Sequence, residues 1–89
     1  MGRAKGNLKK SRQKEIQSLI DATNSNQKVT GVGVTNDLAN MTTYEAEYLL
    51  QQMINRRGWD WYAGDEDRKK ALESQIESMT KIVEIMREQ

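Results

Sequence analysis

Apolar residues recur at helical spacing in three stretches of the chain, and each stretch predicts one helix. The first helix is expected near residues 8–23, where Leu8, Ile16, Leu19 and Ile20 fall along one side. The segment TNSNQ follows, and its residues favour turns over helix interiors. The first prediction is therefore a helix with a single apolar stripe that ends at this segment.

The second helix, expected near residues 42–57, has the most sharply defined start in the chain. Thr42 and Glu45 have the spacing of a capping box, in which each side chain binds a backbone N–H of the other residue. Gly58 is expected to end the helix in the left-handed conformation. The predicted buried stripe comprises Ala46, Leu49, Leu50, Met53 and Ile54, and it is flanked by Tyr44 and Tyr48.

The third helix, expected near residues 66–88, carries the period of a coiled-coil seam. Its apolar residues follow one another at spacings of 4, 3, 4 and 3: Leu72, Ile76, Met79, Val83 and Met86. Ile82 and Ile85 widen this stripe beyond what one partner helix needs. These two residues are therefore predicted to form an oligomer interface, and a homodimer is the expected form.

The run KVTGVGVT, which alternates like a β-strand, separates the first two helices. Gly31 and Gly33 weaken any strand there, so a plain Gly-containing connector is expected. The short loop between the second and third helices favours an antiparallel hairpin. The predicted fold is thus all-α, with three helices in a single domain over residues 8–89, behind a mobile basic leader at residues 1–7.

The composition of the chain argues against most kinds of catalysis. Its 89 residues include no Cys and no His, which removes thiolate nucleophiles, imidazole bases and the usual transition-metal ligands. The acidic residues at 65–67 suit a helix N-terminus better than a metal site. We therefore expect a non-enzymatic protein with no catalytic residue, cofactor or metal. No apolar run is long enough to span a membrane, so no membrane partner and a cytoplasmic location are expected.

Charge is divided unevenly along the chain. Residues 1–30 carry a net charge of +5, whereas residues 31–89 carry −4. Five cations near the N-terminus are the candidate nucleic-acid-binding residues: Lys5, Lys9, Lys10, Arg12 and Lys14. No aromatic residue lies among them, so contacts to phosphates are expected and base readout is not. A solvated, mobile N-terminus without a ligand is the alternative.

Three of the five aromatic residues, Trp59, Trp61 and Tyr62, lie within four positions. Such a cluster can form the centre of a protein interface or stack nucleic-acid bases, so these residues are the candidate partner-binding site. Alternatively, the tryptophans plug the end of the core, because a chain without Phe needs other large core residues. We expect the plug to be their main role.

About half of the chain resembles a short helix–turn–helix-like module. The matching stretches are RQKEIQSLI and NDLANMTTYEAEYLLQQM, set against a pattern of a Gln-containing helix, a Gly-bearing connector, a D-L-x-x-L-T turn and a helix beginning E-A-S-x-L-I. Met41, Glu47 and Leu50 depart from that pattern. Such modules occur in uncharacterised proteins and beside phage recombination and replication proteins. The resemblance implies a phage-type origin, a host-cell cytoplasmic location and a role near DNA metabolism, and it transfers no catalytic residue.

Three functional hypotheses follow from these patterns. The first is a small accessory protein that engages DNA or RNA through its basic N-terminal arm. The second is a phage-encoded inhibitor that binds a host or defence protein through the aromatic loop and an acidic face. The third is a structural oligomer joined through the third helix.

Overall fold

The computed structural model describes residues 10–35, 41–59 and 64–88, and all regular secondary structure in these ranges is helical. The helices are α1 (Lys10–Asn24), α2 (Gln27–Thr30), α3 (Thr43–Arg56) and α5 (Glu66–Arg87). The all-α prediction is confirmed. The prediction of three helices is wrong, because the described residues include the additional short helix α2. The expected leader at residues 1–7 lies outside the described residues.

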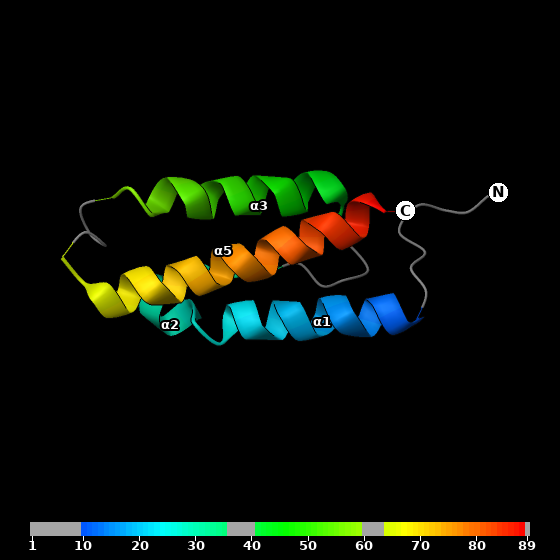
Figure 1. The fold of residues 1–89 in the computed structure, drawn as a ribbon, viewed down its shortest axis with the longest axis horizontal. Helices are drawn as coiled ribbons and strands as arrows, with labels where there is room; N and C mark the ends of the chain where they lie inside the picture. Colours follow the sequence, from blue (N-terminus) through cyan, green and yellow to red (C-terminus); the bar gives the residue numbers. More distant parts are fainter. Residues whose placement is uncertain (1–9, 36–40, 60–63, 89) are drawn as a thin grey trace.

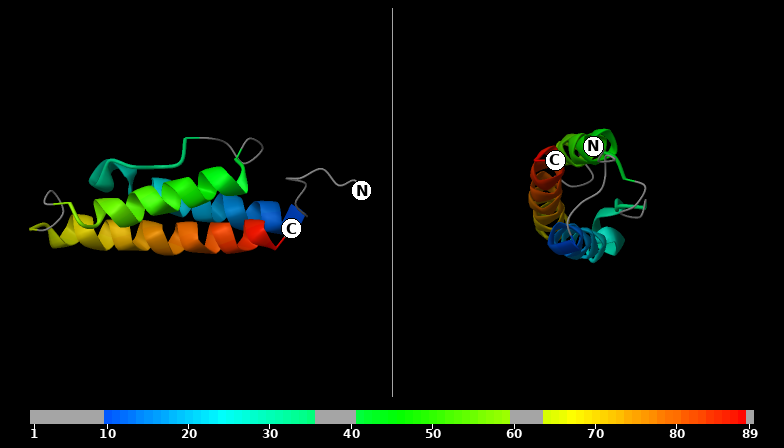
Figure 2. Two further views of the ribbon diagram at one scale, coloured as in Figure 1. Left: turned by 90° about the horizontal axis from the view of Figure 1, so that it is seen from above. Right: turned by 90° about the vertical axis from the view of Figure 1, so that its right-hand side faces the viewer.

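Helix α5 is the central element of the fold. It packs against α1, α2 and α3, and both α1 and α3 run antiparallel to it (Figure 1). The end-on view in Figure 2 shows the three long helices as an arc, with α5 between α1 and α3. The second and third of the expected helices therefore form the predicted antiparallel pair, and α1 and α3 are the two edges of the arc.

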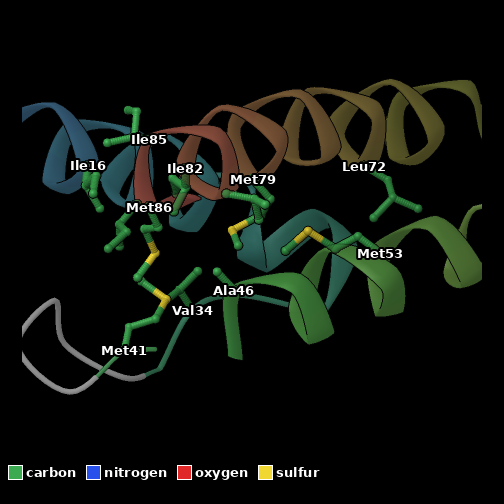
Figure 3. Packing of buried hydrophobic residues seen from close by; sticks show 12 residues of the cluster. Ile16, Val34, Met41, Ala46, Met53, Leu72, Met79, Ile82, Ile85 and Met86 are labelled. Atoms are coloured by element: carbon green, nitrogen blue, oxygen red, sulfur yellow. The ribbon is translucent and has the colours of Figure 1, made fainter. Parts of the chain in front are cut away.

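The core fills the inner side of this arc (Figure 3). All the long helices contribute buried residues, and two more come from the segment between α2 and α3. These two are Val34 and Met41, which are 6% and 5% exposed and lie beside Ala46 and Met86. The connector is therefore part of the core, because its apolar side chains cover the side of the arc that no helix closes.

Ile82 and Ile85 do not lie on an open surface of α5. Ile82 is fully buried and Ile85 is 6% exposed, both within one chain. Helix α5 has two long partner helices, α1 and α3, and not the single partner that the width of its stripe was measured against. The assumption that this stripe is too wide to be covered within the chain is therefore wrong, and self-association stays a prediction without these two residues as its basis.

The start of α3 has the predicted capping box. The backbone N–H of Thr42 donates to Glu45 Oε1, and the backbone N–H of Glu45 donates to Thr42 Oγ1, each at 3.1 Å. The predicted end is wrong, because Arg57 caps α3 in the right-handed conformation and, among the described residues, only Gly31 has positive φ. Instead, the N–H of Gly58 donates to the carbonyl of Asn55, which tightens the last turn.

Helix α2 occupies the beginning of the run in which an extended connector was expected. Its single turn is closed by a hydrogen bond in which the N–H of Gly31 donates to the carbonyl of Gln27 at 2.7 Å. Gly31 has φ 79°, the left-handed value that favours glycine after a helix. Gly31 is therefore not a residue that weakens a strand, as its place in the alternating run suggested, but the residue that ends helix α2.

Polar side chains fix the path of the chain after α2. Asn24 binds both backbone groups of Val34: its Oδ1 accepts from the N–H at 2.7 Å and its Nδ2 donates to the carbonyl at 3.1 Å. Gln75, fully buried on α5, donates through Nε2 to the carbonyls of Thr23 and Val32, each at 2.8 Å. These bonds join α1, α5 and the connector, so Val34 is held over the core.

Candidate nucleic-acid and protein interfaces

The described part of the basic N-terminal site is the start of α1. Lys10 and Lys14 are exposed and lie one helical turn apart. Neither forms an ion pair with any described residue, and the first turn of α1 carries no acidic side chain. The other two lysines of the predicted site, Lys5 and Lys9, lie outside the described residues. The structure therefore presents two solvated cations at the point where the basic N-terminal sequence joins the fold.

Arg12 differs from these lysines because it is already ion-paired. Its guanidinium lies 3.0 Å from Glu15 Oε1, one turn along α1, and 3.0 Å from Glu88 Oε1 at the end of α5. All three side chains are about half-exposed, so solvent screens these pairs. Arg12 thus helps to bring the end of α5 to the start of α1, and a phosphate would have to compete with two carboxylates for it.

A second ion pair neutralises charge at the same end of the molecule. Arg87 of α5 donates to Glu47 Oε2 of α3 through Nε at 2.8 Å and Nη2 at 2.6 Å. Both residues line a groove of about 370 Å³ between α3 and α5, together with Leu50, Ile54 and Val83 among others.

The aromatic site is described only at its first residue. Trp59 is 46% exposed, and the guanidinium carbon of Arg56 lies 4.6 Å from the centre of its ring, a cation–π contact. The expectation that the tryptophans plug the core is therefore wrong for Trp59, which sits at the end of α3 with its ring partly in solvent. Trp61 and Tyr62 lie outside the described residues.

The outer face of α3 was not predicted as a site. Four residues of α3 are exposed, and none of them is charged: Tyr44, Tyr48, Gln51 and Asn55. Tyr44 and Tyr48 are 75% and 56% exposed. On α5, by contrast, every exposed residue except Ser74 is charged. The sequence signal for this α3 face is the spacing of 4, 3 and 4 between its residues, a helical period carried by uncharged polar side chains and not by apolar ones.

Metal-ligand clusters and membrane-spanning helices are two further features to consider in the described ranges. No group of three or more acidic side chains there is placed to hold a metal ion. Asp65 instead caps α5, since its Oδ1 accepts from the N–H of Arg68 at 3.1 Å. No helix within residues 10–35, 41–59 and 64–88 combines the length and apolarity needed to cross a bilayer.

Comparison with known proteins gives no relative: no family model, curated protein or solved structure matches the chain.

Proposed function

We propose that the protein is a small, non-enzymatic, phage-type accessory protein that binds nucleic acid through its basic N-terminal region. The observation that carries this proposal is the pair of solvated lysines, Lys10 and Lys14, at the start of α1. Lys5 and Lys9 precede them in the sequence, which adds two more cations within ten residues. The resemblance to a module found beside phage recombination proteins supports the same conclusion.

Electrostatics explains why a phosphate backbone is a suitable ligand. Cations in the first turn of a helix are opposed by the positive end of the helix dipole. Phosphate oxygens relieve that repulsion, because they accept hydrogen bonds from lysines and are attracted to the same helix end. Arg12 is not among the proposed phosphate-binding residues, since Glu15 and Glu88 already balance its charge. The binding is expected to be independent of base sequence.

A charge-reversal experiment tests the proposal. Binding of a fluorescent single-stranded oligonucleotide is measured at low salt for the full chain and for two double variants, Lys10→Glu/Lys14→Glu and Lys70→Glu/Lys81→Glu. Both variants change the net charge by the same amount, and all four lysines are exposed. We expect the α1 variant to lose at least tenfold in affinity, because two phosphate contacts are removed, and the α5 variant to change it about twofold. Equal losses in both variants would show that only net charge matters and would refute the site.

The exposed indole of Trp59 favours a second candidate function, inhibition of a host or defence protein. Exposed tryptophans with a neighbouring arginine are common at the energetic centre of protein interfaces. The contact between Arg56 and Trp59 holds both side chains at the end of α3. We expect Trp59→Ala to leave the unfolding midpoint nearly unchanged, because the residue is 46% exposed and does not belong to the buried core cluster. A large fall in that midpoint would assign Trp59 to stability and remove the basis of this candidate.

A further inference from the structure

We infer that the outer face of α3 is a self-association surface, on which a second copy of the chain packs with its α3 antiparallel. This inference is independent of the proposed nucleic-acid site, which lies on α1. The surface, hereafter the α3 stripe, consists of Tyr44, Tyr48, Gln51 and Asn55. It lies on an edge helix, and Figure 2 shows α3 at one end of the arc with its partner α5 on one side.

The composition of the α3 stripe is that of an interface. Helix faces that meet only water are usually charged, as the exposed face of α5 is. Interfaces are instead depleted of charge and enriched in tyrosine, which offers a large rigid ring and a hydroxyl. Gln51 Nε2 already donates to Asn55 Oδ1 at 3.1 Å, so these two amides are ordered toward one another.

The spacing of the stripe identifies a copy of the same helix as its occupant. Its residues recur at spacings of 4, 3 and 4, which is the seam of a two-helix coiled coil. This pattern reads the same in both directions, so an antiparallel copy matches it about a two-fold axis between Leu49 and Leu50. Tyr44 then faces Asn55 of the second copy and Tyr48 faces Gln51, which pairs each hydroxyl with an amide.

Charge selects the antiparallel orientation. Glu45 lies in the first turn of α3 and Arg56 in the last, three turns apart on the same flank of the stripe. In an antiparallel pair, the acidic end of each helix lies beside the basic end of the other, and the helix dipoles are opposed. A parallel pair would bring like charges together at both ends. One helix pair is small, so we expect a weak dimer with a dissociation constant on the order of 10 to 100 micromolar.

The test uses sedimentation equilibrium of the full chain over about 10 micromolar to 1 millimolar. In the antiparallel register, the two copies of residue 48 are offset along the helix axis by about 4.5 Å, and so are the two copies of residue 51. Tyr48→Glu and Gln51→Lys should therefore each repel their own copies and weaken the dimer at least tenfold. An equimolar mixture of the two variants should recover association, because the introduced carboxylate of one variant would face the introduced ammonium group of the other across the axis.

Ser74→Glu on the charged face of α5 is the matched control and should dimerise like the natural chain. Circular dichroism should show that every variant keeps its helical content, since the substituted residues are exposed. A natural chain that remains monomeric throughout the concentration range would overturn the inference and leave the stripe to a different partner. A mixture that stays monomeric, or a Tyr48→Glu variant that dimerises normally, would overturn it as well.

Discussion

Single side chains decide the path of the connector, and this is where the sequence was least informative. Asn24 and Gln75 read as ordinary polar residues of a helix, yet each binds backbone groups distant in the chain. Their roles depend on tertiary contacts that neither periodicity nor propensity reports. The capping box of Thr42 and Glu45 was predictable, because both partners lie within one turn.

Gly33 is the first residue whose substitution should be costly. A Cβ at this position would lie 2.7 Å from Gln27 Cδ and 2.8 Å from Asn24 Oδ1. The Gln27 side chain can move aside, but Asn24 Oδ1 is held by its hydrogen bond to the N–H of Val34. We expect Gly33→Ala to lower the free energy of unfolding by about 1–3 kcal/mol.

Chemical denaturation measures this change, and Gly64→Ala is its control. No atom of the described residues lies within 4 Å of a Cβ at Gly64, so that variant should be neutral or slightly stabilising. Equal stability of the two variants would contradict the close packing around Gly33.

Gln75 provides a second test at the same scale. Gln75→Met keeps the shape of the side chain but removes the donor that serves the carbonyls of Thr23 and Val32. The carbonyl of Thr23 would still accept from the N–H of Asn26, and that of Val32 from Thr30 Oγ1, each at 3.2 Å. The expected loss is therefore that of net hydrogen bonding, about 0.5–1.5 kcal/mol by thermal unfolding. Gln17→Met, on the exposed face of α1, should change stability by less than about 0.5 kcal/mol. Equal effects would show that the Gln75 hydrogen bonds contribute nothing.

At the scale of elements, hydrophobic periodicity predicted the three long helices well, with ends within about two residues of those observed in the described ranges. It failed for α2, because one turn of helix is too short to show a period. Periodicity also failed to show that two helices pack on α5. The spacing of apolar residues gives the width of the buried face of a helix, but not the number of helices that cover it. Leu49, Leu50 and Ile54, predicted as buried, are only partly buried because α3 is an edge helix.

The capping box makes a prediction about α3 as an element. Thr42→Ala removes the side-chain acceptor for the N–H of Glu45 and should destabilise the protein by about 1 kcal/mol, whereas Thr42→Ser should retain most of the stability. Hydrogen exchange of the amides in the first turn of α3 should accelerate in the alanine variant. Unchanged exchange in that turn would show that the cap does not hold the start of α3.

At the scale of the whole molecule, charge and exposure divide the surface into distinct regions. Lysines are solvated at the start of α1, ion pairs tie the ends of the three long helices, and α3 presents an uncharged outer face. Net charge along the sequence predicted the first region. It could not predict the ion pairs, since Arg12 and Glu88 are 76 residues apart and meet only in the fold. Nor could it reveal the α3 face, which requires knowing that nothing in the described part of the chain covers those residues.

The salt dependence of nucleic-acid binding is the decisive measurement for phosphate contacts by the N-terminal lysines. Four lysines, Lys5, Lys9, Lys10 and Lys14, are proposed to contact phosphates, so the logarithm of the affinity should fall against the logarithm of salt concentration with a slope of about −3 to −4. Lys10→Glu/Lys14→Glu should reduce the magnitude of that slope by about 2, because it removes two contacts. A slope near zero, or no binding to any nucleic acid at about 50 millimolar salt, would rule out phosphate binding by these lysines.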